Sequence, residues 1–266
     1  MIRVQEINAF SDNYIWCLFD KNKNAIVIDP GCADSVDDYL DKNELNLCAI
    51  LVTHHHPDHI GGVKQLKNKH NCAVYGFKGA GFKFLDYELV DKQKFELLGI
   101  IFETIEVPGH TLDHIAFYAE IDSSGDNIHI EKQASLFCGD TLFSVGCGRL
   151  FEGTAMQMFS SLEKFKKLPL STLIYCAHEY TLNNLKFAES LMPNNKELKA
   201  YKADCKLKRN NNMPTIPSEL QTEFKVNPFL RCDDQEIYES LFEAGLIEEY
   251  SPLAQFTATR KAKDMF

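Results

Sequence analysis

Four of the nine histidines in this 266-residue chain lie close together, in the segment LVTHHHPDHIGG at residues 51–62. In an extended segment, side chains two positions apart point the same way, so His54 and His56 would project together. Asp58 and His59 follow a proline-shaped turn and can present their side chains nearby. Neutral imidazoles and carboxylates are ligands that Zn, Fe and Mn accept. The segment is interrupted by Pro-Asp and lies inside the chain, so we interpret it as part of a metal site rather than a polar loop or an affinity tag.

One segment cannot complete a metal site, and three later residues of metal-binding type occur at a similar place in the sequence. His110 in PGHT, Asp140 in CGD and His178 in AHEY each follow the end of an apolar strand-like run. A single residue of this kind is more often a surface residue or a satisfied one. Three of them together with the histidine cluster indicate one site assembled from strand ends, where functional side chains concentrate.

The elements that must position these residues are mostly strands. Apolar or alternating runs rich in β-branched and aromatic residues predict them. They lie at residues 2–7, 14–19, 25–28, 49–52, 100–107, 114–121, 134–138 and 172–176. Helical patterns occur at 34–42, 62–69 and 155–167, the last with Thr154 as its N-cap. The segment DSSGDN at 122–127 predicts a hairpin turn. This alternation is typical of an α/β fold.

The last third of the chain differs in composition, because it has few β-branched residues. Helical patterns follow at 181–192, 194–208 and roughly 233–244. A Pro/Asn-rich loop separates the second pattern from the third, at 210–219. We therefore expect two domains, an α/β domain at 1–180 and a helical domain at 181–266.

The segment THHHPDH resembles the THxHxDH motif of the metallo-β-lactamase superfamily, and PGHT, GDTLF and HEYT fit that superfamily in order and spacing. The resemblance covers essentially the whole chain. It is most specific for the glyoxalase II (hydroxyacylglutathione hydrolase) family, through GDTLFSVGCGRLFEGT at 139–154, HEYT at 178–181 and RKAKDMF at 260–266. It implies an αββα sandwich with two metals at one edge and a helical C-terminal domain that binds substrate.

The resemblance also implies a role for each residue of metal-binding type. The first metal would be held by His54, His56 and His110, the second by Asp58, His59 and His178, and Asp140 would bridge the two. Asp29, in IVIDPG, would be a structural carboxylate or one that supports a ligand. The expected cofactors are two divalent ions, with Zn favoured and Fe or Mn also compatible with nitrogen and oxygen ligands.

The reaction implied by the resemblance is hydrolysis of an S-2-hydroxyacylglutathione, typified by S-D-lactoylglutathione, to glutathione and a 2-hydroxy acid. This is the second step of methylglyoxal detoxification. A hydroxide shared by the two metals would attack the thioester carbonyl, because binding to metal lowers the pKa of water to about 7. Asp58 would have a second role, orienting that hydroxide or accepting its proton.

Glutathione carries two carboxylates, so its site needs cations and hydrogen-bond donors. The resemblance assigns this role to Arg149, Tyr180, Arg260 and Lys263. Some family members carry Tyr where this chain has Phe151, whose ring cannot donate a hydrogen bond. We therefore expect an altered affinity for glutathione and the same reaction.

Several neighbouring polar residues are expected outside the ligand set. His55 is excluded as a ligand, His114 is expected in the core or behind a ligand, and Asp113 is expected to orient a ligand. Two histidines without a motif are expected at the surface, His70 and His129.

Composition limits the class of protein. The formal net charge is -10, with 28 basic and 38 acidic residues, which disfavours nucleic acid and anionic membrane as partners. The chain shows no apolar stretch of spanning length and no signal-peptide pattern. The nine cysteines include no CxxC pair, which favours buried free thiols in a reducing cytosol. We expect a cytoplasmic monomer that binds a small glutathione thioester.

The sequence disfavours four other functions. β-Lactamases of the superfamily usually have an export signal and lack the helical tail, and persulfide dioxygenases use one iron and lack the full ligand set. Nuclease relatives would need a basic surface. A metal-binding module without turnover is disfavoured by the complete ligand set and the basic tail. These considerations favour thioester hydrolysis.

Overall fold

The chain folds into two compact units. The computed structural model describes residues 1–80, 82–122 and 132–266. Unit 1 consists of Met1–Glu106 and Asp113–Gly139, and unit 2 consists of Val107–Leu112 and Asp140–Phe266.

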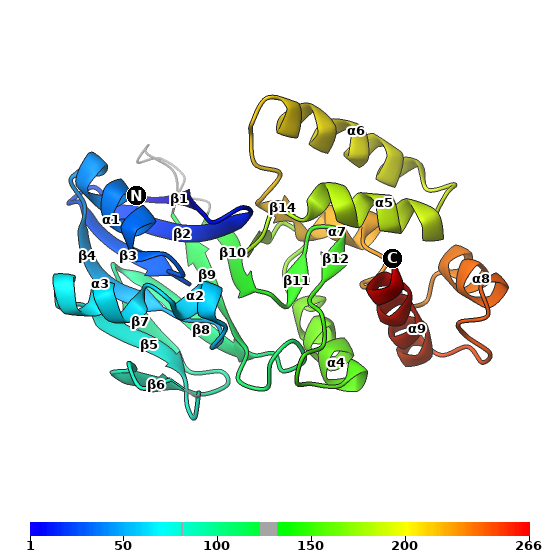
Figure 1. Ribbon diagram of the computed structural model, residues 1–266, viewed down its shortest axis with the longest axis horizontal. Helices are drawn as coiled ribbons and strands as arrows, with labels where there is room; N and C mark the ends of the chain where they lie inside the picture. Colours follow the sequence, from blue (N-terminus) through cyan, green and yellow to red (C-terminus); the bar gives the residue numbers. More distant parts are fainter. Residues whose placement is uncertain (81, 123–131) are drawn as a thin grey trace. The chain divides into compact units, whose positions relative to one another are not determined.

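Unit 1 contains two groups of strands and a set of helices (Figure 1). Its strands are β1 (Ile2–Ala9), β2 (Asn13–Asp20), β3 (Asn24–Ile28), β4 (Asn46–Leu51), β5 (Ala73–Phe77), β6 (Tyr87–Leu89), β7 (Lys94–Leu97), β8 (Ile100–Glu106), β9 (Ile115–Ile121) and β10 (Gln133–Gly139). Its helices are α1 (Ala33–Asn43), α2 (Pro57–Ile60) and α3 (Val63–His70). The strands and helices predicted for this region are confirmed, whereas β5, β6 and β7 were missed because they are short and have many half-exposed residues.

The first group of strands forms one mixed sheet in chain order from β1 to β6. The pairs β1–β2 and β2–β3 are antiparallel, and the pairs from β3 to β6 are parallel. The crossover through α1 joins β3 to β4, and the crossover through α2 and α3 joins β4 to β5, as parallel pairing requires. The histidine-rich segment lies on this second crossover.

The second group, β7 to β10, pairs antiparallel throughout unit 1. Ile121 of β9 lies opposite Gln133 of β10, so these strands form a hairpin. Residues 123–127 of the predicted turn, and His129, lie outside the described residues. The two groups of strands meet through aromatic side chains, with the ring centroids of Tyr75 and Phe95 5.3 Å apart.

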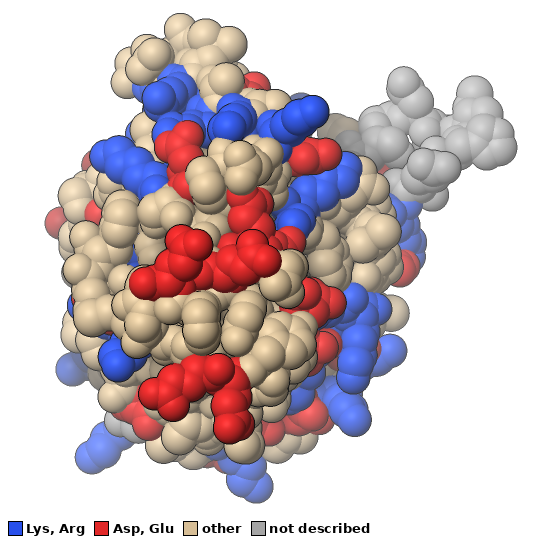
Figure 2. All heavy atoms as spheres, turned by 90° about the vertical axis from the view of Figure 1, so that its right-hand side faces the viewer, with Lys and Arg blue, Asp and Glu red and all other residues tan. Residues whose placement is uncertain are grey.

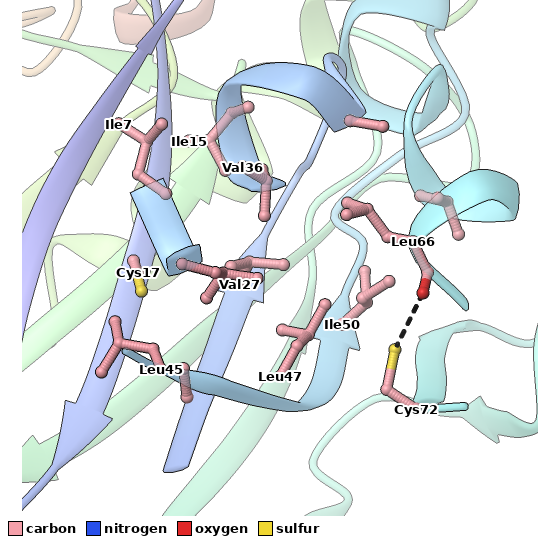
Figure 3. Packing of buried hydrophobic residues seen from close by; sticks show 14 of the residues in the cluster. Ile7, Ile15, Cys17, Val27, Val36, Leu45, Leu47, Ile50, Leu66 and Cys72 are labelled. Atoms are coloured by element: carbon pink, nitrogen blue, oxygen red, sulfur yellow. Dashed lines mark hydrogen bonds between the residues drawn. The ribbon is translucent and has the colours of Figure 1, made fainter. Parts of the chain in front are cut away.

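One core of unit 1 lies between the first sheet and its helices (Figure 3). Ile15, Cys17 and Val27 point from the sheet into this cluster, where Val36 of α1 and Leu66 of α3 cover them. The intervening strand residues are buried as well, facing the other side of the sheet. Burial on both faces explains why β2, β3 and β4 appear in the sequence as almost continuous apolar runs.

Unit 2 is mainly helical (Figure 1). Its helices are α4 (Ala155–Phe165), α5 (Thr181–Leu191), α6 (Lys196–Asn210), α7 (Leu220–Val226), α8 (Gln235–Glu243) and α9 (Pro252–Met265). Its strands are β11 (Leu142–Phe143), β12 (Gly146–Cys147), β13 (Leu173–Cys176) and β14 (Ser218–Glu219). Thr154 caps α4 as predicted, in a reciprocal capping box with Gln157. Helices α7 and α9 and the short β11–β12 hairpin were not predicted.

Three sequence-level expectations bear on the whole chain. Among the described residues, no helix is both long enough and apolar enough to cross a bilayer. All nine cysteines are free thiols, as predicted, but Cys32 is half-buried and Cys48 is exposed, so the expectation of buried thiols is confirmed only for the other seven. The two compact units divide at Gly139, upstream of the predicted domain boundary at residue 180. The division into 1–180 and 181–266 therefore stays a prediction.

Candidate metal centre and substrate pocket

The histidine-rich loop of unit 1 runs from the end of β4 into α2. His54 and His59 are buried, and their ring centroids lie 4.1 Å apart. The ring centroid of His56 lies 4.7 Å from that of His54. His114 is fully buried and stacks on His54 at 4.5 Å, which agrees with its expected place behind the ligands. Three of the predicted imidazole ligands, His54, His56 and His59, thus lie close together.

The backbone of α2 approaches the turn after β3 very closely. A Cβ atom on Gly31 would lie 1.8 Å from the carbonyl oxygen of Asp58, so only glycine permits this contact. The Asp58 carboxylate accepts a hydrogen bond from Asn13 Nδ2 at 3.0 Å and lies 3.5 Å from His59 Nε2. Asn13 was not identified from the sequence, where nothing distinguishes it from other strand-end asparagines.

Asp29 is a buried carboxylate that organises the histidine loop from behind. It accepts hydrogen bonds from the backbone N–H and the hydroxyl of Thr53, each at 2.7 Å, and from His59 Nδ1 at 3.0 Å. With its proton on Nδ1, the neutral His59 ring presents the lone pair of Nε2 for metal binding. Asp29 therefore has the supporting role that was expected of it.

Asp113 does not orient one of the predicted ligands in the way the sequence suggested. Its Oδ1 lies 2.8 Å from Nδ1 of His55, the histidine excluded from the ligand set. The physical reason is local, because the backbone N–H of Ile115 donates to the carbonyl of Thr53 at 2.9 Å. That contact aligns the segment after Asp113 with the histidine loop and places its carboxylate at His55.

Unit 2 brings together the other predicted ligands, His110, Asp140 and His178, all buried. His110 Nε2 lies 3.4 Å from Asp140 Oδ2, and His178 Nε2 lies 3.4 Å from Asp140 Oδ1. His110 Nδ1 donates to the carbonyl oxygen of Arg149 at 2.8 Å, which directs its Nε2 lone pair toward Asp140. A Cβ atom on Gly148 would lie 1.9 Å from the Asp140 carbonyl oxygen, so this approach also requires glycine.

These separations fit a metal-bound carboxylate better than a hydrogen-bonded one. Hydrogen bonds between N–H groups and oxygens are typically about 2.9 Å long. Two ligand atoms that each lie about 2.1 Å from a tetrahedral ion are separated by about 3.4 Å. Because the two oxygens of Asp140 face different imidazoles, the donor set of unit 2 fits a carboxylate shared between two ions.

A pocket of about 320 Å³ opens beside this group within unit 2. Its wall contains both imidazole and cationic side chains: His110, Asp140, Phe143, Cys147, Arg149, Phe151, Tyr180, Asn184, Arg260 and Lys263. All four predicted substrate contacts are among them. The pocket thus joins part of the predicted ligand set to a cluster of positive charge.

The cations of this pocket differ in how they are held. Arg260 is buried, and its guanidinium donates to the Cys147 carbonyl and to Asp264, each at 2.9 Å. Arg149 is more exposed, with its Nε 3.5 Å from Asp264. Burial, reinforced by the positive charges of Arg260 and Arg149, lowers the pKa of Lys263 to about 8. Arg260 therefore stabilises the lining of the pocket, while Arg149 and Lys263 are better placed to bind an anion.

Aromatic rings complete the pocket. Tyr180 stacks on His178 at 4.7 Å, with the ring planes 4° apart. Phe151 is 62% exposed and presents an edge contact to His110 at 5.2 Å. Phe143 contacts the Tyr180 ring at 5.2 Å. Phe143 and Cys147 were not assigned from the sequence, although both lie in the motif at 139–154 that carried the family resemblance.

Comparisons with known proteins agree with this arrangement of motifs. The family model for the metallo-beta-lactamase superfamily matches residues 14–178, and that for the hydroxyacylglutathione hydrolase C-terminus matches 179–266. The hydroxyacylglutathione hydrolase of Vibrio campbellii is 44% identical and that of Chromohalobacter salexigens 43% identical, each over the full length of both chains.

Solved structures confirm the predicted fold class. ETHE1 from Myxococcus xanthus superimposes with a TM-score of 0.64 at 22% identity, covering 94% of this chain and 92% of the other. The BLEG-1 B3 metallo-beta-lactamase gives a TM-score of 0.63 at 21% identity, covering 87% of this chain and 100% of the other. At such identities the likeness shows the fold, an α/β metallo-β-lactamase sandwich with a helical C-terminal region. Together with the full-length relatives, these findings show that the chain belongs to the hydroxyacylglutathione hydrolase (glyoxalase II) family of the metallo-β-lactamase superfamily.

Proposed function

We propose that this protein hydrolyses S-2-hydroxyacylglutathione thioesters, with S-D-lactoylglutathione as the typical substrate, to glutathione and a 2-hydroxy acid. The observation that carries the proposal is the pocket of unit 2, where imidazole and carboxylate donors lie beside Arg149 and Lys263. Full-length identity to hydroxyacylglutathione hydrolases supports the same reaction. In the cell, this reaction would be the second step of methylglyoxal detoxification.

The proposed cofactors are two divalent ions. By resemblance to the family, the first is assigned to His54, His56 and His110, the second to Asp58, His59 and His178, and Asp140 is assigned to both. These nitrogen and oxygen donors suit Zn best and also accept Fe or Mn. Bound ions would supply hydroxide at neutral pH and withdraw electron density from the thioester carbonyl.

The protein's own residues prepare that chemistry by fixing proton positions. The Asp29 carboxylate holds a proton on His59 Nδ1, and the Arg149 carbonyl holds one on His110 Nδ1. Both rings therefore keep Nε2 available as a ligand atom. Asp58, whose carboxylate Asn13 orients, is proposed as the acceptor of the proton from the attacking water.

The glutathione moiety would lie against the cationic wall of the pocket. Arg149 and Lys263 would attract its carboxylates, and the Tyr180 hydroxyl would donate a hydrogen bond. Arg260 contributes by holding Cys147 and Asp264 in place and by adding positive charge.

We also propose that the protein works as a cytoplasmic monomer, without nucleic acid or membrane as a partner. On the face shown in Figure 2, acidic side chains lie across the middle and basic ones mainly along the upper and right-hand edges, so no continuous basic surface crosses this face among the described residues. An acidic middle gives little electrostatic attraction to a polyanion.

The test is hydrolysis of S-D-lactoylglutathione, followed by the loss of its ultraviolet thioester absorbance, before and after chelation. We expect activity that disappears with the chelator and returns with Zn, Fe or Mn, and metal analysis would identify the ion carried. A lactoyl thioester of a thiol without carboxylates is the matched control and should react poorly. Hydrolysis that resists chelation, or oxygen uptake with glutathione persulfide, would contradict the proposal.

A further inference from the structure

The turn between β11 and β12 holds a β-branched residue in an unfavourable backbone conformation. Val145 has φ 58 and is completely buried. Left-handed backbone suits glycine or asparagine, and for valine it is a genuine outlier that only its surroundings can maintain. The turn lies in the motif at 139–154, between two residues that line the pocket, Phe143 and Cys147.

Buried side chains from the helical part of unit 2 hold this turn. Glu223 of α7 accepts a hydrogen bond from the Val145 backbone N–H at 2.8 Å. Asn227 Nδ2 lies 3.0 Å from the same carboxyl oxygen, and 3.1 Å from the carbonyl oxygens of Phe143 and of Gly146. Glu223 and Asn227 are both fully buried. The strained residue and both of its flanking strands are thus bound by one pair of side chains.

Other helices hold the same turn. Asn184 of α5 donates to the carbonyl oxygen of Ser144 at 3.0 Å. The hydroxyl of Ser144 lies 2.9 Å from that of Tyr201 on α6. Because three helices contribute, the turn cannot shift without breaking several buried hydrogen bonds, each costly to leave unmade.

The position of this turn determines two sides of the pocket. Phe143, before the turn, contacts the rings of His178 and Tyr180 with centroids 5.9 Å and 5.2 Å away. Cys147, after the turn, accepts the hydrogen bond from Arg260. A displaced turn would therefore move the ring behind His178 and release the arginine beside Lys263.

From these contacts we infer that Glu223, assisted by Asn227, is a positioning residue for substrate binding: it keeps Val145 in its left-handed conformation and so holds Phe143 and Cys147 in the pocket wall. Glu223 touches neither the predicted ligands nor the pocket lining in the contacts above. Burial raises the pKa of its carboxyl group, which favours an uncharged acceptor. Glutamine keeps both the accepting oxygen and the size of such a group.

The experiment compares Glu223→Gln, Glu223→Ala and Glu223→Ala/Val145→Gly with wild type, and uses Glu248→Ala as an exposed-glutamate control. With S-D-lactoylglutathione, we expect KM to rise about tenfold in Glu223→Ala, with a smaller change in kcat, and to stay near wild type in Glu223→Gln. Glycine accepts left-handed backbone without help. A Val145→Gly single variant serves as the reference for the double variant. The KM of the double variant should lie close to that of Val145→Gly and well below that of Glu223→Ala, which a merely stabilising role of Glu223 would not produce.

The kinetic readout rests on the proposed function, so a second readout is independent of it. Hydrogen exchange of the 142–147 amides should accelerate in Glu223→Ala, and stay slow in Glu223→Gln and in the control. If wild type lacks thioesterase activity, the proposed function fails, but hydrogen exchange still tests whether Glu223 stabilises the backbone of Val145. Unchanged exchange and KM in Glu223→Ala would overturn the inference, as would a double variant no better than Glu223→Ala.

Discussion

The two units hold their predicted metal ligands by different means. In unit 1 the donors are neighbours in sequence, on one short loop between β4 and α3, and a single carboxylate, Asp29, supports them from behind. In unit 2 the donors come from three separate segments, and His110 and His178 are 68 positions apart by their numbers in the sequence. There the ligands depend on long-range contacts, such as the one from His110 to the Arg149 carbonyl.

This difference indicates which substitutions would disrupt the predicted ligands of each unit. A compact loop concentrates its support in a few hydrogen bonds to one carboxylate, so single substitutions around Asp29 should affect the ligands directly. Ligands that come from distant segments depend on turns and helices for their positions. The residues that stabilise them, such as Val145 and Glu223, therefore lie far apart in the sequence. Substitutions in the two units can therefore be compared directly.

The largest effect is expected from Asp140→Asn. The amide keeps the size but loses the charge and one of the two oxygens that face His110 and His178. Turnover should fall by more than about 100-fold, beyond the range usual for groups that only support ligands. Activity against S-D-lactoylglutathione together with metal content measures this, and Asp113→Asn, which alters the contact with His55, is the control expected near wild type. An active Asp140→Asn enzyme would remove the residue from the ligand set.

Asp58→Ala is the matching test in unit 1. Because Asp58 is assigned to one ion only, most of that second ion and most of the turnover should be lost, while the first ion stays bound. Metal analysis at a defined protein concentration would show about one ion per chain in place of two. Full activity in this variant would exclude Asp58 both as a ligand and as a proton acceptor.

Asp29→Asn tests the support of the loop without changing a predicted ligand. Asparagine tolerates the left-handed backbone of residue 29 (φ 55) and can still accept from the Thr53 N–H. Its NH₂ group would face His59 Nδ1 and favour the tautomer with the proton on Nε2. We expect metal affinity to fall about 10- to 100-fold with little change in Tm. Unchanged affinity, measured by competition with a chelator, would mean that the tautomer is set by another group.

The comparison also separates what the sequence could predict from what it could not. The loop ligands follow from local spacing, and the strands before them from apolar runs that are buried on both faces. His110, Asp140 and His178 could be proposed because each follows a predicted strand and matches a family motif. Asn13, Phe143 and the Glu223–Val145 contact could not, because each is defined by chain segments that meet only in the fold.

Some strands and helices could not be predicted from the sequence either. The strands β5 to β7 are short and include exposed or half-exposed positions, and α7 and α9 begin within or after loops rich in polar residues. The sequence predicts that Asp113 orients a ligand, because it is adjacent to motif histidines. Its actual partner is set by the backbone contact between Ile115 and Thr53, which spacing in the sequence does not reveal.

A smaller effect is expected from the pH dependence of substrate capture in unit 2. The pKa of Lys263 is lowered to about 8, so its ammonium is charged below that pH and loses its proton above it. Attraction for the carboxylates of glutathione should be complete well below pH 8 and decline as the pH rises through 8. We expect kcat/KM, which reports the free enzyme, to fall about two- to fivefold above pH 8 through this group. Lys263→Arg stays charged and should lack this decline, and an identical alkaline limb in that variant would assign it to another group.

The smallest effect is expected from Phe151→Tyr, which adds a hydroxyl at the rim of the pocket. Phe151 is 62% exposed, so water competes for any new hydrogen bond and the net gain is small. KM should fall about two- to threefold with kcat unchanged, and Tyr180→Phe, which removes a hydroxyl from the same pocket, should raise KM by a similar factor. The Phe151 ring also contacts His110 at 5.2 Å. A change in kcat rather than KM would therefore mean that residue 151 acts through this histidine and not through glutathione.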